Sequence, residues 1–220
     1  MECGLELKNI SYLNNKEKKL ILNDASYSFE NGKIYGLVEQ NFDIKSMLLV
    51  LTGGFKKPQS GTIVYKGKEL KQIGLTNYRQ QDLALIFKDN NLIHYLNAYE
   101  NVLNSLTIAN LKKRNKKDYC LKTLMDLGLN KEDCFKDVTK LTKYQYQLVV
   151  LACALVRQVE IIVADEIIEG LNQKEANDLV ELLINLAHQG RCIIVMTRLV
   201  SLAQKFDVQL KIIDGQIVRQ

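Results

Sequence analysis

The chain has 220 residues, of which 47% are apolar, enough for one domain with a sizeable core. Its 30 basic and 25 acidic side chains leave a formal net charge of +5, modest for this length, and we expect no nucleic-acid partner. Apolar runs stay shorter than the roughly 18 residues of a membrane span, and residues 1–10 lack the apolar region of a signal peptide. We therefore expect any link to a membrane to pass through a partner.

The use of cysteine and histidine argues against a metal-centred protein. The cysteines number five, and no pair of them has the spacing of a metal site. The two histidines, His94 and His188, lie far apart in the sequence. Reduced thiols in the cytoplasm are the expected state, and a zinc site is not expected.

The N-terminal part of the chain predicts strands around one helix. Residues 5–13 alternate between apolar and polar side chains, as a half-buried strand does. Residues 25–38 predict two strands joined at Asn31-Gly32, a dipeptide typical of hairpin turns. The next predicted elements are a helix over 45–53, a strand between two turns within 58–70, and a short buried strand over 83–87.

Helical spacing of apolar residues prevails from about residue 92 to residue 156. The basic run LKKRNKK at 111–117 lies within it, and the favoured interpretation is a solvated loop or helix face, with a nucleic-acid or anionic-lipid patch as the alternative. Continuous apolar strands follow at 160–165 and 192–196, separated by a helix. An Asp-Gly turn predicts a closing hairpin over 208–218.

Buried strands that alternate with helices predict an α/β fold with a parallel central sheet. We expect residues 1–91 and 157–220 to form this core together with an N-terminal antiparallel β patch. Residues 92–156 are expected to form an inserted α-helical subdomain. No internal repeat or proline-rich linker divides the chain, so residues 1–220 are expected to be a single domain.

A possible nucleotide site lies in residues 36–47, GLVEQNFDIKSM. A phosphate-binding loop reads G-x-x-x-x-G-K-[ST] and joins a strand to a helix whose free N–H groups face the phosphates. Here the predicted strand, the predicted helix, Lys45 and Ser46 are in place, but the glycines are missing. Because a Lys-Ser pair alone is a weak signal, the interpretation depends on the segments that follow.

The order of those segments resembles the ATP-binding subunits of ABC transporters, especially the branch that serves lipoprotein release and macrolide efflux. LTGGFKKPQSGTIVYKGKEL (51–70) resembles the stretch after their phosphate loop, and LALIFKDNNLIHYLNAYENV (83–102) resembles their Q-loop region. LTKYQYQLVVLACALV (141–156) takes the place of the signature helix. IIVADEIIEGLN (161–172) resembles Walker B with the D-loop, and CIIVMTR (192–198) takes the place of the switch strand. The resemblance implies a P-loop NTPase core.

The phosphate loop departs from this family in several positions. Glu39, Phe42 and Ile44 stand where the family has glycine, and Met47 replaces a threonine that contacts phosphate. A left-handed backbone costs a non-glycine residue about 1–2 kcal/mol. The acidic Glu39 and Asp43 would also repel phosphate, by about 3 kcal/mol for a unit charge at roughly 5 Å. We therefore expect ordinary ATP binding to be lost, and Phe42 or Ile44 to fill the vacated space.

The other ATP-binding motifs depart as well. The signature LSGGQ here reads LTKYQ (141–145), in which Tyr144 fills space that the family leaves to backbone. Lys88 replaces the Q-loop glutamine, Arg198 replaces the switch histidine, and Asn172 replaces the D-loop aspartate. Lys88 and Arg198 thus occupy catalytic positions with altered chemistry.

Walker B is preserved. The resemblance implies that Asp165 and Ser46 would hold Mg²⁺, that Lys45 would contact phosphate, and that Glu166 would polarise the attacking water. The alternative for Asp165 and Glu166 is an acidic strand end without chemistry. Tyr12 is either the aromatic residue that stacks on adenine or an ordinary surface tyrosine.

Together these features imply a pseudo-ATPase, with no cofactor or only weakly bound Mg-ATP, in a structural or regulatory role beside a membrane permease. Two alternatives stay open: a working ATPase that energises export of a peptide, lipoprotein or drug, and a soluble regulatory binding module. The expected partners are a permease subunit and, in a dimer, a second copy or another ABC ATPase subunit. The expected location is cytoplasmic, on the inner face of the cell membrane.

Overall fold

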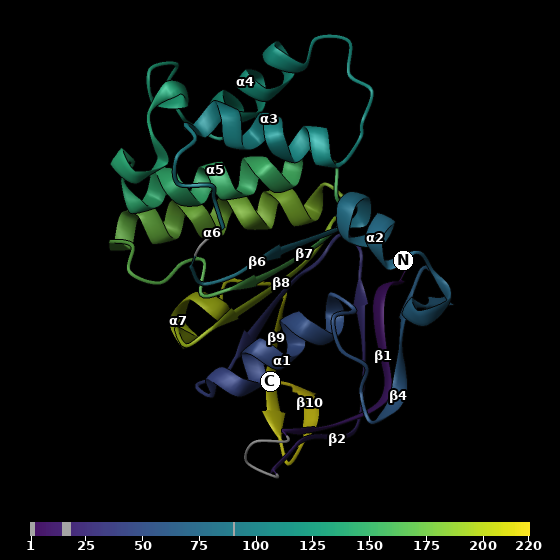
Figure 1. The fold of residues 1–220 in the computed structure, drawn as a ribbon. Coiled ribbons are helices and arrows are strands. Elements are labelled where there is room, and N and C mark those ends of the chain that lie inside the picture. Colours follow the sequence, from purple (N-terminus) through teal and green to yellow (C-terminus); the bar gives the residue numbers. More distant parts are fainter. Residues whose placement is uncertain (1–2, 15–18, 90) are drawn as a thin grey trace.

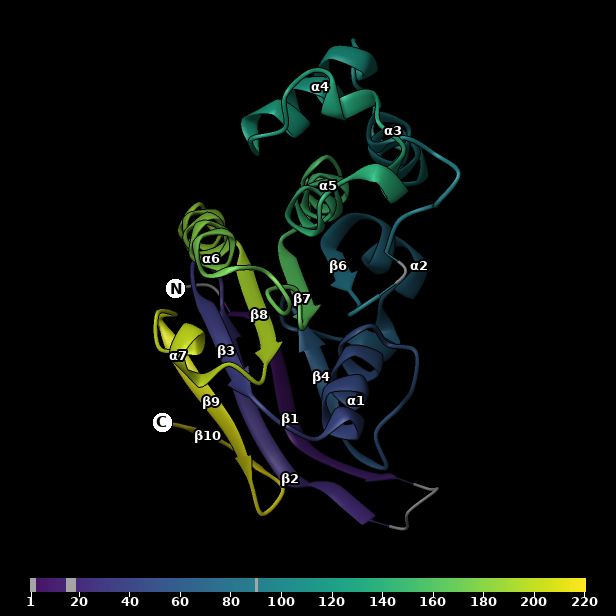
Figure 2. The same cartoon turned by 90° about the vertical axis from the view of Figure 1, so that its left-hand side faces the viewer.

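The computed structural model describes residues 3–14, 19–89 and 91–220. A six-stranded sheet crosses the molecule, with helices α3 (Ala98–Ile108) to α6 (Gln173–His188) on one face and helix α1 (Phe42–Thr52) with a smaller sheet on the other (Figures 1 and 2). No helix in the described ranges is long and apolar enough to span a bilayer.

The smaller sheet is the predicted antiparallel patch. It contains β1 (Cys3–Asn14), β2 (Lys19–Glu30), β4 (Ser60–Tyr65) and β5 (Lys68–Glu69), in the order β2-β1-β4-β5. Every neighbouring pair in it is antiparallel. The strands predicted over 5–13 and within 58–70 are therefore confirmed.

The larger sheet has the order β10-β9-β3-β8-β7-β6. Its strands are β3 (Ile34–Val38), β6 (Leu83–Ile86), β7 (Ile161–Asp165), β8 (Cys192–Thr197), β9 (Val208–Ile213) and β10 (Gln216–Arg219). From β9 to β6 the neighbours are parallel, and β10 closes the sheet as the predicted antiparallel hairpin with β9. The predicted α/β fold with a parallel core is thus confirmed.

The hairpin predicted at Asn31-Gly32 is wrong. A turn does lie there, and Gly32 has a φ of +82°, but β2 pairs with β1 while β3 pairs with β8 and β9. The two strands differ in burial, because β3 is buried along its whole length whereas β2 alternates. A strand buried on both faces belongs in the middle of a parallel sheet, so the turn reverses the chain between two sheets.

The principal helices are α1 (Phe42–Thr52), α3 (Ala98–Ile108), α4 (Lys116–Asp126), α5 (Lys143–Leu155) and α6 (Gln173–His188). Shorter helical turns are α2 (Leu75–Asn77), α7 (Val200–Ala203), a π-turn at Tyr78–Asp82 and 3₁₀ turns at Leu70–Gln72, Asp133–Phe135 and Val138–Lys140. Capping boxes start α3, α5 and α6, so local side chains determine where these helices begin. Helices α3 to α5 lie between β6 and β7 in the chain, while the subdomain boundaries at 91/92 and 156/157 remain predictions.

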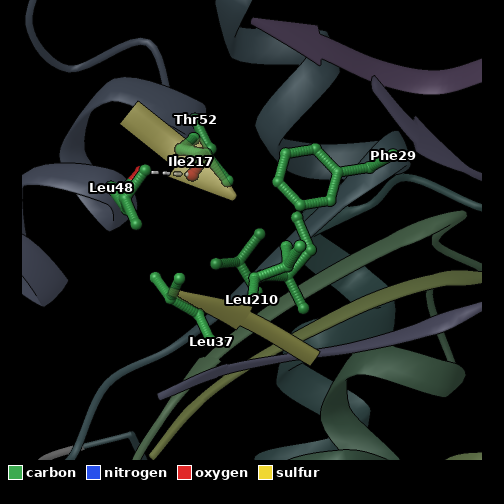
Figure 3. Close-up of a pocket in the computed structure, with 8 residues that line it drawn as sticks. Phe29, Leu37, Leu48, Thr52, Leu210 and Ile217 are labelled. Carbon is green, nitrogen blue, oxygen red and sulfur yellow. Dashed lines mark hydrogen bonds between the residues drawn. The ribbon is translucent and has the colours of Figure 1, made fainter. Parts of the chain in front are cut away.

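Apolar cores lie on both faces of the six-stranded sheet. In β7, Ile162 faces the helices α3 to α6, whereas Ile161 and Val163 face α1 and the smaller sheet. On the α1 side a void of about 10 Å³ remains, lined almost entirely by apolar side chains (Figure 3). The lining hydroxyl of Thr52 donates to the Leu48 carbonyl at 2.7 Å. A dry space of this size is a packing defect rather than a ligand site.

Gly61, at the start of β4, allows a test of the close packing between neighbouring strands of the smaller sheet. Its φ is +81°, and a Cβ added there would lie 2.3 Å from the carbonyl oxygens of Lys8 and Asn9. Gly61→Ala is expected to lower the free energy of unfolding by about 2 kcal/mol or more, from left-handed strain and this clash. Gly32→Ala is the matched control, because Gly32 has a φ of +82° and open space around it. Denaturant titrations giving equal losses for both variants would contradict the close packing around Gly61.

Candidate functional site

The polar site lies where four parallel strands end. In sheet order β3, β8, β7 and β6, the segments that follow these strands carry Lys45, Arg198, Glu166 and Lys88. Asp165 is the last residue of β7. Because parallel strands end at the same edge of the sheet, residues far apart in the sequence meet at this edge. The structure therefore brings together five of the residues singled out by the motifs.

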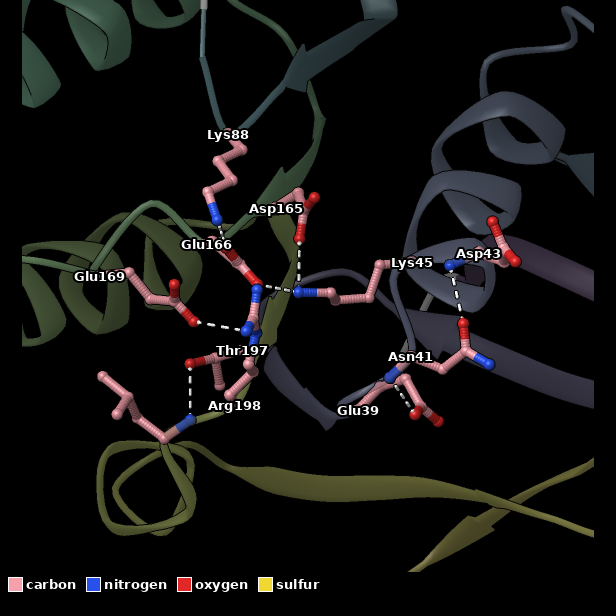
Figure 4. Close-up of polar contacts among 11 residues, drawn as sticks. Glu39, Asn41, Asp43, Lys45, Lys88, Asp165, Glu166, Glu169, Thr197 and Arg198 are labelled. Carbon is pink, nitrogen blue, oxygen red and sulfur yellow. Dashed lines mark hydrogen bonds and ion pairs between the residues drawn. The ribbon is translucent and has the colours of Figure 1, made fainter.

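Six side chains form a connected group, the ion cluster: Lys45, Lys88, Arg198, Asp165, Glu166 and Glu169 (Figure 4). Glu166 is at its centre, with Oε2 at 2.6 Å from Lys88 Nζ and Oε1 at 2.7 Å from Arg198 Nε. The Lys45 ammonium also donates to Glu166 Oε1. Three cations and three carboxylates thus give the cluster no formal net charge.

Burial makes these contacts strong. Lys45 is completely buried, and Asp165 and Glu166 are each only 3% exposed. Lys45 Nζ lies 3.5 Å from Asp165 Oδ1, so the ammonium is enclosed between two carboxylates. A lysine is rarely buried in this way unless it is paired, and the pair remains costly to break.

The pKa values of the three carboxyl groups in the ion cluster shift in different directions. Burial alone would raise the pKa of Glu166, but hydrogen bonds from Lys45, Lys88 and Arg198 hold it well below its usual range. Burial raises the pKa of Asp165, with Lys45 partly offsetting the effect. The pKa of Glu169 is raised by burial and by its contact with Glu166. Glu166 is therefore the carboxylate most firmly held in its charged form.

The loop after β3 uses its own side chains to satisfy its backbone. Glu39 Oε1 accepts a hydrogen bond from the Asn41 amide at 2.7 Å, and Asn41 Oδ1 accepts one from the Asp43 amide at 2.8 Å. The Glu39 amide in turn donates to the Thr197 carbonyl at 3.1 Å, which fixes the loop to β8. The amides of Asn41 and Asp43, at the entry to α1, are therefore already paired.

The left-handed strain predicted for this loop is absent. No residue from 39 to 44 has a positive φ, although the backbone of all six is described. Helix α1 begins at Phe42 instead of near Lys45, so Phe42 and Ile44 take up ordinary helical backbone. Ile44 is half-buried and packs against the core on the α1 side. The side chain of Phe42 lies outside the described parts, so its predicted place remains a prediction.

Ser46 and Asp165 come together, whereas Tyr12 stays apart. A cavity of about 250 Å³ is lined by Ser46, Asp165 and Lys88, with contributions from α1 and residues 87–89. The pair predicted for Mg²⁺ thus shares one cavity. Tyr12 lies on β1 opposite Leu22 and is half-buried against the core. None of its described contacts reaches the ion cluster.

The segments at the signature and D-loop positions have local structural roles. Thr142 caps α5 and forms a capping box with Gln145, and Asn172 caps α6 in the same way. Tyr144 is half-buried against the helical core. The ammonium of Lys143 lies so close to Gly170 that a Cβ there would be 2.4 Å away. Lys143 therefore contacts the segment that follows Walker B within the same chain.

The motifs miss one member of the ion cluster, Glu169, and they give Glu39 a different role from the one it has in the structure. The sequence predicts that Glu39 repels phosphate, but in the structure Glu39 Oε1 accepts a hydrogen bond from the Asn41 amide. Glu169 approaches Arg198 at 3.6 Å. The sequence does contain a signal for a further acidic partner such as Glu169. Lys88 and Arg198 replace uncharged residues of the motifs, and two added cations beside buried carboxylates need acidic partners.

Comparisons with known proteins agree with this arrangement. Residues 22–169 match the protein family described as ABC transporter. The chain is 31% identical over 212 residues to the uncharacterized ABC transporter ATP-binding protein YclH of Bacillus subtilis, covering 96% of this chain and 94% of that protein. It is 26% identical to the lipoprotein-releasing system ATP-binding protein LolD of Wigglesworthia glossinidia brevipalpis, covering 98% and 96%.

The fold has close counterparts among solved structures. The dimeric structure of MJ0796, a bacterial ABC transporter cassette, superposes with a TM-score of 0.85 at 23% identity, covering 98% of this chain and 97% of that chain. The order of motifs, the parallel sheet and these matches lead to one assignment. The chain belongs to the ABC transporter family and has the fold of its ATP-binding domain.

Proposed function

We propose that this chain is a pseudo-ATPase, an ABC transporter ATP-binding subunit with a structural or regulatory role beside a membrane permease. The observation that carries the proposal is the ion cluster. Lys45, the lysine of the phosphate loop, is completely buried between Asp165 and Glu166. The groups that would meet Mg²⁺ and phosphate are instead joined to one another.

The residues present do not fit a bound triphosphate in this arrangement. A phosphate cradle needs free backbone amides, but the Asn41 and Asp43 amides are paired with side chains of the same loop. Glu39 places a carboxylate in the cradle, where it would repel a phosphate. Ser46 and Asp165 share a cavity, yet the Asp165 carboxylate faces the ammonium of Lys45.

Glu166 is also poorly suited to act as a general base. Three cations contact its carboxylate, and they hold its pKa well below the usual range. A base works best when its pKa lies near the working pH, so a carboxylate stabilised this strongly takes up a proton weakly. Lys88 and Arg198 supply two of these contacts, and both replace the residues that the family motifs would have.

The proposed partners follow from the relatives. LolD is named as the ATP-binding protein of a lipoprotein-releasing system, and MJ0796 was solved as a dimer. We infer a membrane permease as the main partner, with a homodimer or a heterodimer with another ABC ATPase subunit as the assembly. The chain would then lie in the cytoplasm, on the inner face of the cell membrane.

A working ATPase that energises export of a peptide, lipoprotein or drug is the second candidate. It is favoured by the shared cavity of Ser46 and Asp165 and by relatives that are named ATP-binding proteins. The pseudo-ATPase proposal rests on the closed ion cluster, so a direct measurement of nucleotide binding separates the two. Co-purification with a permease separates both from a soluble regulatory binding module.

The purified chain is expected to bind Mg-ATP only weakly, with a Kd no tighter than the millimolar range, about 4 kcal/mol of binding free energy. The reason is that binding must open the contacts of Lys45 and expose phosphate to the Glu39 carboxylate. Isothermal titration calorimetry measures this, with LolD in the same buffer as positive control. A low-micromolar Kd would show that the cluster opens readily and would favour the working ATPase.

A further inference from the structure

The net charge of the chain is concentrated in one short segment. Five of the 30 basic residues lie within residues 112–117, which contain no acidic residue. The other 25 basic residues are equalled in number by the 25 acidic residues of the whole chain. The formal charge of +5 therefore belongs to this segment, while the rest of the molecule is balanced.

The segment, which we name the basic corner, consists of Lys112, Lys113, Arg114, Lys116 and Lys117. It joins α3 to α4 and projects from the helical subdomain at the top of the molecule, away from both sheets (Figure 1). Four of these side chains are exposed, and that of Lys113 is half-buried. Lys113 lies over the ring of Tyr119, 4.6 Å from its centroid.

The fold makes little use of these cations, apart from the contact of Lys113 with the ring of Tyr119. Within the described ranges none of the five forms an ion pair with a carboxylate. The nearest acid in the sequence, Asp118, is bound to Asn115. Lys116 and Lys117 lie in the first turn of α4, where the helix dipole disfavours positive charge. A cluster that is unpaired and unfavourably placed for folding points to an external anionic partner.

We propose that the basic corner binds anionic lipid headgroups at a membrane surface. A compact group of five cations on a projecting corner can meet a charged plane without any matching groove. Ile108, at the end of α3 and the start of the same loop, is 50% exposed and provides an apolar contact beside the cations. The inference rests in part on the proposed function, because a permease partner would bring the chain to a membrane.

The geometry favours lipid over nucleic acid. Single-stranded nucleic acid is held by a basic groove with exposed aromatic rings on which bases stack. In the basic corner the neighbouring ring, Tyr119, is only partly exposed and is covered by Lys113. The cations are confined to six successive residues, which is shorter than the basic groove that tracks a nucleic-acid backbone.

The test is co-sedimentation of the purified full chain with vesicles of phosphatidylcholine containing about one third phosphatidylglycerol, at about 0.1 M salt and without nucleotide. Each cation near such a surface contributes about a five-fold factor in partitioning. The combined variant Lys112→Gln, Arg114→Gln and Lys117→Gln is therefore expected to bind about 100-fold less. Binding should be absent with pure phosphatidylcholine and should weaken steeply as salt is raised.

The matched control is Lys56→Gln, Lys57→Gln and Lys68→Gln, which removes the same charge from exposed positions elsewhere. This control should bind anionic vesicles nearly as well as the parent chain. Equal loss in both variants, binding to neutral vesicles, or tighter corner-dependent binding to single-stranded DNA at the same salt would each overturn the proposal. The vesicle assay contains no nucleotide or permease, so its outcome is independent of the calorimetry that tests the pseudo-ATPase.

Discussion

Replacement of Lys45 by methionine is expected to lower the free energy of unfolding by about 3–5 kcal/mol at pH 7. The Lys45 ammonium is completely buried between Asp165 and Glu166. Methionine has a similar length but no charge, so it leaves two adjacent carboxylates buried without the cation that lies between them. The cost is that of an uncompensated buried charge rather than of a lost surface contact.

The loss should depend on pH in a defined direction. Burial raises the pKa of Asp165. A carboxyl whose pKa is higher in the folded state than in the unfolded state lowers stability at high pH, and this loss disappears as the pH falls and the carboxyl becomes protonated in the folded state. Removing Lys45 takes away the offsetting cation, raises this pKa further and enlarges the cost at pH 7. For Glu166 the folded pKa is lowered, so its contribution is present above its unfolded pKa of about 4.3 and disappears as the pH falls. Both effects make the deficit of the variant shrink as the pH falls, the Asp165 part through the raised folded pKa of Asp165 and the Glu166 part through the lowered folded pKa of Glu166.

Guanidinium titrations of parent and variant at pH 7 and at pH 4 measure this deficit. Lys88→Met is the matched control, because Lys88 contacts the same Glu166 carboxylate but is 44% exposed. Its loss should be much smaller, since water can replace the ammonium at the surface. Similar losses for both lysines, or a deficit that grows as the pH falls, would mean that Lys45 is not enclosed between the two carboxylates.

Most of the fold could be predicted because its signals are local. The alternation in β1, the apolar runs of β7 and β8, and the Asp214-Gly215 turn each identify an element without knowledge of the rest. Pairing between strands depends on contacts far apart in the chain. The Asn31-Gly32 signal is therefore right for a turn and wrong for a hairpin, because the partner of each strand lies elsewhere.

Five of the six members of the ion cluster could be named from the motifs, but their arrangement could not. The motif order singles out Lys45, Lys88, Asp165, Glu166 and Arg198, and the structure places all of them in the ion cluster. The contacts between these side chains could not be predicted, because a motif position does not show which side chains pair when the motif is altered. Lys88 and Arg198 pair with Glu166, whereas the sequence leaves open whether they would neutralise the acidic loop or bind another anion.

The backbone of the phosphate loop is a second feature that the motifs could not predict. The prediction of strain assumes that Phe42 and Ile44 keep the path of a glycine-containing loop. In the structure the helix extends to Phe42 and Asn41 caps it, so residues 39–44 avoid left-handed conformations. Side chains unsuited to a loop are accommodated by a change of secondary structure, which shortens the loop instead of straining it.

Restoring glycine at positions 39, 42 and 44 is expected to tighten Mg-ATP binding by about 100-fold or more, without restoring turnover. Loss of the Glu39 carboxylate removes a repulsion of about 3 kcal/mol and frees the Asn41 amide. Glycine in place of Phe42 and Ile44 destabilises the first turn of α1 by about 1 kcal/mol at each position, so this turn can unwind into a loop. Calorimetry and steady-state phosphate release are the two measurements.

The matched control is alanine at the same three positions. Alanine removes the same charge and bulk but favours a helix, so α1 should still begin near residue 42 and the gain in binding should be smaller than with glycine. Equal gains would show that side chains alone, and not the extended helix, oppose binding.

Turnover is expected to stay absent because hydrolysis needs more than a bound nucleotide. The attacking water must be positioned beside a free carboxylate, and such positioning is worth several orders of magnitude in rate. In the glycine variant Lys88 and Arg198 still hold Glu166, and Tyr144 still occupies the signature position. Phosphate release above about 1 s⁻¹, an ordinary enzyme rate, with these residues unchanged would place the whole defect in the phosphate loop. Such a rate would also show that the cations around Glu166 do not prevent this carboxylate from activating water.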